Sequence, residues 1–187
     1  MIEVERKRQI SSTDEPVIRS RLTEANYHAT STMVEVDTYY SRPDVDFLQT
    51  VECLRVRQSD GFAEITYKPA STATTHSAAD IIAKQETNLI LRDAADAETA
   101  HQFLTNLGMV FLARVEKVRT TYRNPTSPDI TVTVDAVTDV GMFIETEINA
   151  TDPDTATVLL EATEQQLKVT GLPVISLPYR DLVLQLN

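Results

Sequence analysis

The amino-acid sequence predicts an α+β fold that is mainly β, and three observations lead to this expectation. Apolar and charged residues alternate with a period of two in segments that recur from one end of the chain to the other. A few further segments carry helix signals instead of alternation. No linker, composition break or internal repeat divides the 187 residues, of which 42% are hydrophobic. We therefore expect a single domain over residues 1–187 with a sizeable core.

The alternation predicts eight strands, each with β-branched residues on one face and charged residues on the other. Asp60-Gly61 and Asp139-Val140-Gly141 have the composition of tight hairpin turns. Asn124-Pro125 ends the longest strand. The predicted strands are residues 2–10, 28–40, 53–57, 63–68, 81–91, 109–123, 130–137 and 142–149.

Capping residues predict three helices. Thr13-Asp14-Glu15-Pro16 is typical of a helix start, and Gly108 follows the end of the second helix. Asp152-Pro153-Asp154 opens the third, with proline at a position where its missing N–H costs little. These helices are expected over residues 14–24, 96–106 and 152–169, with a short helix or turn after 178 and a mobile Ala/Ser/Thr loop at 69–80.

Charge and composition exclude several functional classes. The 17 Lys and Arg against 28 Asp and Glu give a net charge of -11, which argues against a nucleic acid polymer as partner. Four widely separated glycines exclude a P-loop or a Rossmann fingerprint, and one cysteine excludes an internal disulfide or a cysteine zinc site. The charged N-terminus and the lack of a long apolar run predict a soluble, cytoplasmic protein with no membrane partner.

Acids and bases occur as spaced pairs on the charged faces, where ordinary solvent-facing strands mix Thr, Ser, Gln and Lys. Carboxylates at positions i and i+2 can share a hard divalent cation such as Mg²⁺ or Mn²⁺. Spaced Arg and Lys residues suit consecutive phosphate groups. The pairs are Glu3/Glu5, Arg55/Arg57, Lys117/Arg119 and Glu145/Glu147, joined on the same faces by Lys7, Glu64, Lys68, Lys84, Glu86 and Asp135.

A barrel with helices outside would turn these charged faces into the lining of a polar tunnel. The alternative is a sheet whose charged face is simply solvated. In the barrel, the lining residues balance at seven bases and seven acids. One or two bound divalent cations would then make the tunnel net positive, the sign that a polyphosphate ligand requires.

The motifs, taken in order, resemble those of the CYTH superfamily, also called the triphosphate tunnel metalloenzymes. Glu3-Val4-Glu5-Arg6-Lys7 matches the ExExK signature of that family, and the resemblance extends from residue 2 to about residue 148. The surroundings of Leu54-Arg55-Val56-Arg57 look most like the cyclase-type branch within the class IV adenylyl cyclase and thiamine triphosphatase group. The further matching segments are residues 37–40, 66–68, 84–86, 117–122, 134–137 and 141–147.

The resemblance implies an eight-stranded antiparallel β-barrel, or tunnel, with a charged interior and helices packed outside. It also implies a divalent metal, Mg²⁺ or Mn²⁺, and a small-molecule triphosphate substrate. Asn88 stands where the family pattern often has a second acid. The implied residues are Glu3, Glu5, Asp135, Glu145 and Glu147 for the metal; Lys7, Arg55, Arg57, Lys68, Lys117 and Arg119 for phosphates; Glu5, Lys7 and Glu145 for catalysis; and Lys84 and Glu86 in support.

Three functions remain open on this evidence. The favoured one is hydrolysis of an inorganic, nucleotide or thiamine triphosphate at the terminal phosphate. The second is a class IV adenylyl cyclase that converts ATP to cyclic AMP and pyrophosphate. The third is a sensor that binds a polyphosphate or nucleotide without turning it over. A homodimer is a further expectation.

Overall fold

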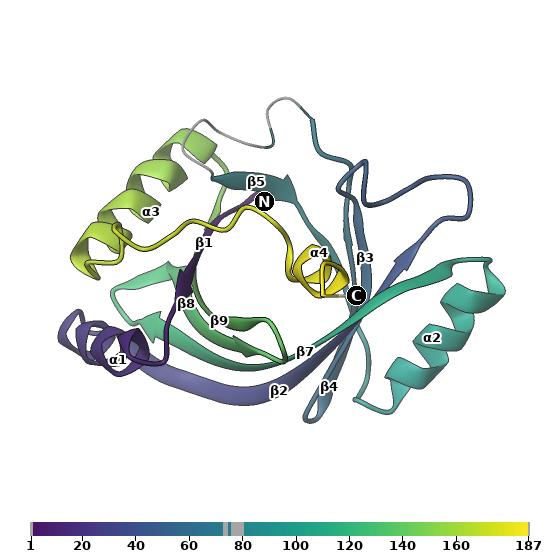
Figure 1. The fold of residues 1–187 in the computed structure, drawn as a ribbon, viewed down its shortest axis with the longest axis horizontal. Helices are drawn as coiled ribbons and strands as arrows, with labels where there is room; N and C mark the ends of the chain where they lie inside the picture. The colour runs from purple at the N-terminus through teal and green to yellow at the C-terminus, as the bar shows by residue number, and fades with distance from the viewer. Residues whose placement is uncertain (1, 73–74, 76–80, 187) are drawn as a thin grey trace.

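The computed structural model describes residues 2–72, 75 and 81–186 and contains one nine-stranded antiparallel sheet with four helices. Figure 1 shows the strands arranged as a ring. The sheet order is β5-β1-β9-β8-β7-β2-β3-β4-β6. The strands are β1 (Ile2–Ile10), β2 (His28–Ser41), β3 (Cys53–Ser59), β4 (Phe62–Lys68), β5 (Ile82–Gln85), β6 (Thr87–Ile90), β7 (Val110–Asn124), β8 (Ser127–Val137) and β9 (Gly141–Ala150), and the helices are α1 (Asp14–Glu24), α2 (Asp96–Asn106), α3 (Pro153–Gln166) and α4 (Tyr179–Leu184).

The sheet is nearly closed because its two edge strands are consecutive in the chain. β5 pairs with β1 at one edge and β6 pairs with β4 at the other, and only Glu86 separates β5 from β6. The expected strand over residues 81–91 is therefore two strands, so the expected count of eight was wrong by one. The physical reason is that one segment changes partners at Glu86, where it joins the two edges. The predicted tunnel is otherwise confirmed.

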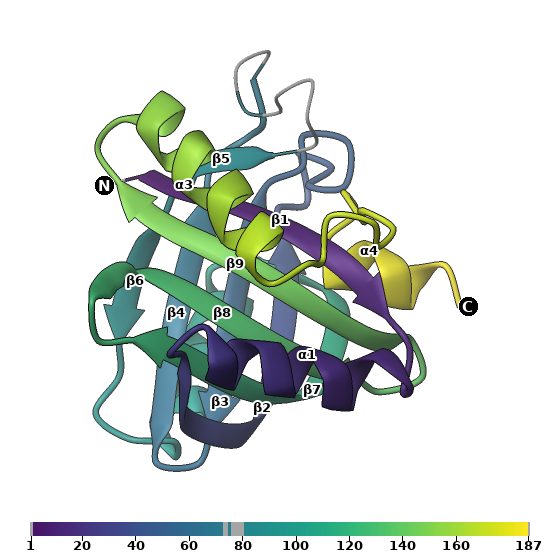
Figure 2. The same cartoon turned by 90° about the vertical axis from the view of Figure 1, so that its left-hand side faces the viewer.

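Helices cover the outside of the ring on two sides, as the apolar faces of the strands predicted. Ile18 and Leu22 of α1 and Leu160 of α3 pack on the outward residues of β1, β8 and β9. Figure 2 shows α1 and α3 in front of these strands. On the other side, Ala100 and Leu104 of α2 pack on β2, β3 and β4. Burial of these apolar side chains is the main term that stabilises each helix on the sheet.

The inward face of the strands is charged only over part of its length. At one end it becomes apolar, with Tyr39, Val115, Val137 and Phe143 packed against Tyr179 at the start of α4. These positions continue the inward phase of β2, β7, β8 and β9. The C-terminal helix, expected only as a short helix or turn on the body, thus closes one end of the charged interior.

Most of the segment predicted as a mobile loop lies outside the residues that the structure describes. Residues 69–72 and 75 belong to neither a helix nor a strand. The remainder of the predicted loop, residues 73–74 and 76–80, lies outside the described residues. Among the helices of the described chain, none is long and apolar enough to cross a membrane.

Candidate active site

A cavity of about 490 Å³ occupies the charged part of the ring interior. Of the 13 residues that the sequence analysis assigned to a site, 12 line this cavity. The exception is Asp135. The lining members are Glu3, Glu5, Lys7, Arg55, Arg57, Lys68, Lys84, Glu86, Lys117, Arg119, Glu145 and Glu147.

One wall of the cavity is built on a fixed arginine–aspartate pair. Arg57 of β3 donates from Nε to Asp37 Oδ1 (2.6 Å) and from its terminal nitrogen to Asp37 Oδ2 (2.7 Å). The two residues are direct neighbours across β2 and β3, so the backbone register delivers the bidentate geometry. Burial alone would raise the pKa of Asp37, but the guanidinium groups of Arg57 and Arg55 outweigh it and hold that pKa well below its usual range.

A second fixed cluster surrounds Arg119 on β7. Its guanidinium donates to both oxygens of Asp135 (2.7 and 2.5 Å) and to Glu145 Oε2 (2.5 Å). Tyr179 of α4 donates its hydroxyl to Asp135 Oδ2 (3.0 Å). Asp135 is fully buried behind Arg119 and does not line the cavity. Its carboxylate therefore orients Arg119 and Tyr179.

Lys117 lies between these two clusters. Its ammonium is 3.3 Å from Glu35 Oε2 and 3.7 Å from Asp135 Oδ2, distances that are long for hydrogen bonds but short enough for strong electrostatic attraction. Burial lowers the pKa of Lys117, and the neighbouring Arg119 adds to the effect. Lys117 is thus a buried cation that adds positive potential to the cavity wall.

The opposite part of the cavity is acidic. Glu5 of β1 and Glu147 of β9 are direct cross-strand neighbours, an arrangement in which two like charges destabilise a sheet. Burial raises the pKa of Glu147, and the Glu5 carboxylate raises it further. Within the described chain, no hydrogen bond or ion pair reaches the Glu5 carboxylate. The Asn149 side chain donates to Glu147 Oε1 (2.8 Å).

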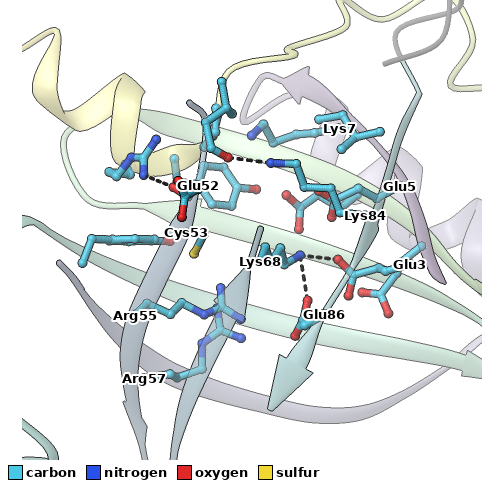
Figure 3. Close-up of a pocket in the computed structure, with 18 of the residues that line it drawn as sticks. Glu3, Glu5, Lys7, Glu52, Cys53, Arg55, Arg57, Lys68, Lys84 and Glu86 are labelled. Carbon is cyan, nitrogen blue, oxygen red and sulfur yellow. Dashed lines mark hydrogen bonds and ion pairs between the residues drawn. The ribbon is translucent and has the colours of Figure 1, made fainter. Parts of the chain in front are cut away.

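Lys68 joins two more acids at this end. Figure 3 shows its ammonium between Glu3 of β1 and Glu86. It donates to Glu3 and lies 2.7 Å from Glu86 Oε2. Burial raises the pKa of Glu3 to about 9, despite the opposing effect of Lys68. Burial would also raise the pKa of Glu86, but Lys68 and Arg55 outweigh it and lower that pKa to about 2.

The acidic end fits a hard divalent cation in its chemistry. Buried carboxylates that face one another without enough positive charge need a cation, and oxygen donors suit Mg²⁺ or Mn²⁺. The ligands are not already gathered, however. In the described ranges, no group of three or more His, Cys, Asp or Glu side chains forms a ready-made metal site. Lys68, Arg119 and Asn149 hold several of the carboxylates instead.

Three cations that line the cavity make no hydrogen bond to a carboxylate among the residues that the structure describes. The nearest carboxylate oxygen to Arg55 is Asp37 Oδ2 at 3.6 Å, and its buried Nε has no hydrogen-bond partner among the described residues. The Lys7 ammonium donates to the Leu177 carbonyl (2.6 Å), and burial lowers its pKa. The Lys84 ammonium donates to backbone carbonyls of Val51 (2.5 Å) and Pro69 (3.2 Å). These groups can turn to an anionic ligand with little loss.

Several site residues were absent from the predicted set. Glu35 and Asp37 sit on the inward phase of β2, so the same sorting of strand faces could have found them; Asp37 appeared only within a matching motif. Tyr179 and Arg180 lie beyond the matched region and have no strand periodicity. Arg180 is almost fully buried and donates to the Glu52 carbonyl (2.6 Å), which attaches α4 to the segment before β3.

Comparisons with known proteins agree with the tunnel geometry. A family model described as CYTH domain matches residues 1–177. The chain is 28% identical over 172 residues to the putative adenylate cyclase MJ0240 of Methanocaldococcus jannaschii, covering 92% of this chain and 91% of that protein.

Solved structures have the same fold. The chain is similar to the PH1819 protein of Pyrococcus horikoshii OT3, with a TM-score of 0.80, 24% identity and 99% of each chain covered. It is also similar to the putative adenylyl cyclase HpAC1 from Hippeastrum, described as having a dominant triphosphatase activity. In that case the TM-score is 0.66 and the identity 15%, over 95% of this chain and 91% of the other.

Proposed function

The chain belongs to the CYTH domain family, and from this premise we propose that it is a divalent-metal-dependent triphosphatase that releases the terminal phosphate of a small-molecule triphosphate. One observation carries the proposal. One cavity joins cations that make no hydrogen bond to a described carboxylate, with Arg55 the clearest example, to the half-buried Glu5/Glu147 carboxylate pair. An oligophosphate with its divalent cation satisfies both needs at once.

Phosphate binding is divided between cations that bond no carboxylate of the described residues and cations that internal carboxylates hold in place. Lys7 and Arg55 make no hydrogen bond to a carboxylate of the described residues, so their donors are available to phosphate oxygens. Arg57, Lys117 and Arg119 are held by internal carboxylates and contribute mainly through the positive potential of the wall. Fixed charges of this kind need no reorganisation during a reaction, which is how preorganised sites lower barriers.

Glu3, Glu5, Glu145 and Glu147 would hold Mg²⁺ or Mn²⁺. A bound ion would neutralise negative charge on the phosphoryl oxygens. Asp135 was expected close to the metal. Because it is buried behind Arg119, we assign it the positioning of Arg119 and Tyr179.

The chemical step requires a water placed in line with the terminal phosphorus. The Glu5 carboxylate, which has no hydrogen bond from the described residues, can accept a proton of that water. Glu145, which Arg119 holds in place, provides a second carboxylate that can accept a proton. The water oxygen bonds to phosphorus while the bond from phosphorus to the bridging oxygen breaks. Arg55 and Lys7 neutralise the charge that develops on the leaving diphosphate.

Cyclase activity is the second candidate, and the name of the Methanocaldococcus jannaschii relative favours it. In that reaction the ribose 3′-hydroxyl attacks the α-phosphorus and pyrophosphate leaves. The dominant triphosphatase activity described for the Hippeastrum protein favours hydrolysis. Hydrolysis also requires no recognition of a nucleoside.

A product assay tests the proposal. Purified protein with Mg²⁺ or Mn²⁺ receives inorganic triphosphate, ATP or thiamine triphosphate, and products are separated by chromatography. Orthophosphate release that Glu5→Gln and Arg55→Met abolish or strongly reduce, and that the exposed outer-face variant Glu116→Gln retains, supports the triphosphatase. Cyclic AMP with pyrophosphate identifies the cyclase. Saturable binding without any product identifies a sensor.

A further inference from the structure

Lys68 does not point its ammonium at the cationic wall where phosphates are expected to bind. It reaches across the cavity from the end of β4 to Glu3 on β1 and to Glu86 (Figure 3). Burial would lower the pKa of Lys68, but the carboxylates of Glu5 and Glu3 outweigh it and hold that pKa well above its usual range.

The acidic end has too little positive charge of its own. Four carboxylates, those of Glu3, Glu5, Glu86 and Glu147, line it, and Lys68 is the cation that contacts two of them. Glu5 and Glu147 are direct cross-strand neighbours, so two like charges face each other here. Lys68 thus serves as the counter-ion of the acidic end in the metal-free protein.

The other lysine of this region behaves differently. Lys84 also lines the cavity, but among the described residues its ammonium donates to backbone carbonyls alone, those of Val51 and Pro69. Lys84 is the direct cross-strand neighbour of Glu3, but within the described chain its ammonium makes no ion pair with Glu3 or Glu86. The two lysines form a natural matched pair, because both place one cation in the same cavity and only one of them occupies carboxylates.

We propose that Lys68 is a tethered counter-ion that competes with the divalent cation for Glu3, and that metal binding frees its ammonium to bind phosphate. This inference rests on the proposed function, since it takes Glu3 as a metal ligand. A phosphate cannot use Lys68 while Glu3 and Glu86 hold the ammonium. A metal on Glu3 removes one of the two carboxylates that contact Lys68 and weakens the hold on its ammonium, which can then turn toward an incoming triphosphate.

The coupling must act in both directions. If the metal raises the affinity for triphosphate by releasing Lys68, then triphosphate raises the affinity for the metal by the same factor. The metal and the triphosphate therefore bind cooperatively, beyond their direct attraction. Replacing Lys68 removes this part of the cooperativity.

Calorimetric titration with Mn²⁺ alone tests the competition. Wild type, Lys68→Met and Lys84→Met are titrated at one fixed pH without any phosphate, after circular dichroism has shown that each is folded. We expect Lys68→Met to bind Mn²⁺ at least about tenfold more tightly than wild type, because a unit charge in contact with a ligand is lost. We expect Lys84→Met to stay within about threefold of wild type, since screening weakens its more distant effect.

The outcomes separate this inference from the proposed function. Tighter Mn²⁺ binding by Lys68→Met than by Lys84→Met supports the competition. Equal Mn²⁺ binding by wild type and Lys68→Met overturns the competition and leaves the metal-dependent enzyme standing. Failure of all three proteins to bind Mn²⁺ overturns both, because the carboxylates would then hold no metal even without the competing ammonium.

A second readout uses the wild type and does not depend on the folding of a variant. A crystal of the wild-type protein soaked in MnCl₂ shows where the Lys68 ammonium lies once Mn²⁺ is bound. Separation of the ammonium from Glu3, with Mn²⁺ on that carboxylate, supports the inference. Mn²⁺ on Glu3 with the Lys68 ion pair intact overturns it.

Discussion

Glu5 on β1 and Glu147 on β9 stand directly opposite each other in the sheet, with both carboxylates facing the cavity. The next inward positions along the same two strands pair Lys7 with Glu145, which are opposite charges. The register of β1 and β9 therefore creates one favourable pair and one unfavourable pair side by side. The unfavourable pair is the position where a bound cation would stabilise the protein most.

The Glu5/Glu147 repulsion predicts that Glu147→Gln stabilises the metal-free protein. In EDTA we expect its free energy of unfolding to exceed that of wild type by up to about 1 kcal/mol, because a directly opposed like-charge pair is relieved. Saturating Mn²⁺ should stabilise wild type, by about 2.7 kcal/mol at a hundredfold excess over Kd, and should affect Glu147→Gln much less. Urea titrations with and without Mn²⁺ measure both effects, with Glu116→Gln as control. An equal response of Glu147→Gln and wild type to Mn²⁺ contradicts the assignment.

Asp37 predicts a specific dependence of stability on pH. Its pKa in the folded protein is lower than in the unfolded chain, so its stabilising effect is present above about pH 4 and is lost as the pH falls toward the folded-state pKa. Asp37→Asn should cost about 3–5 kcal/mol at neutral pH by leaving Arg57 buried without its partner. The difference in free energy of unfolding between Asp37→Asn and wild type should then narrow as the pH is lowered below about 4.

Urea titrations of wild type and Asp37→Asn at several pH values between neutral and acid measure this gap. Asp129→Asn, an exposed carboxylate on β8, is the matched control and should track wild type throughout. A gap between Asp37→Asn and wild type that stays constant with pH would show that Asp37 does not carry the charge assigned to it.

Arg55 and Arg57 are two residues apart on β3 but should differ in function. Arg57 is bonded to Asp37, whereas Arg55 is not. Arg57→Met should lower the free energy of unfolding by about 3–5 kcal/mol, because a buried carboxylate loses its main partner. Arg55→Met should change stability much less and weaken binding of inorganic triphosphate about tenfold or more, as expected for lost charged hydrogen bonds. Urea titration measures the stability of each variant, and calorimetry measures its binding of inorganic triphosphate. Equal stability losses for Arg55→Met and Arg57→Met would refute the distinction.

The outer face of β1 gives a prediction independent of the cavity. Glu164 of α3 is fully buried and accepts hydrogen bonds from Arg6 (2.6 Å) and Arg8 (2.9 and 2.8 Å). Glu164→Ala should lower the free energy of unfolding by about 3–5 kcal/mol. Glu161→Ala, whose side chain is 47% exposed and 3.7 Å from Arg6, should cost at most about 1 kcal/mol. Thermal unfolding compares them, and a smaller loss for Glu164→Ala than for Glu161→Ala would contradict this assignment.

Much of the fold could be predicted from the sequence because a strand reveals its faces through a period of two. The same sorting brought 12 predicted residues to one cavity. It could not find Arg6 and Arg8, since they lie on the apolar phase of β1 and are buried by a partner on α3 that is far away in sequence. Only the tertiary packing of α3 places Glu164 over them.

The rest depends on long-range geometry that alternation does not encode. The division of residues 81–91 into two strands results from closure of the sheet, a property of all the strands together. Tyr179 and Arg180 reach the site because the C-terminal segment turns back over the end of the ring, where Arg180 bonds the Glu52 carbonyl. The inward orientation of Asp135 was predicted, but its position behind Arg119 required side-chain geometry.

The central claim is hydrolysis at the terminal phosphorus, and isotope labelling tests it most directly. The protein is incubated with ATP or inorganic triphosphate and Mn²⁺ in water enriched in ¹⁸O, the Mn²⁺ is removed, and the products are examined by ³¹P NMR and mass spectrometry. The account predicts orthophosphate carrying one ¹⁸O atom from the solvent, with unlabelled ADP or pyrophosphate as the other product. Cyclic AMP with unlabelled pyrophosphate from ATP, or label in the diphosphate product, would contradict it.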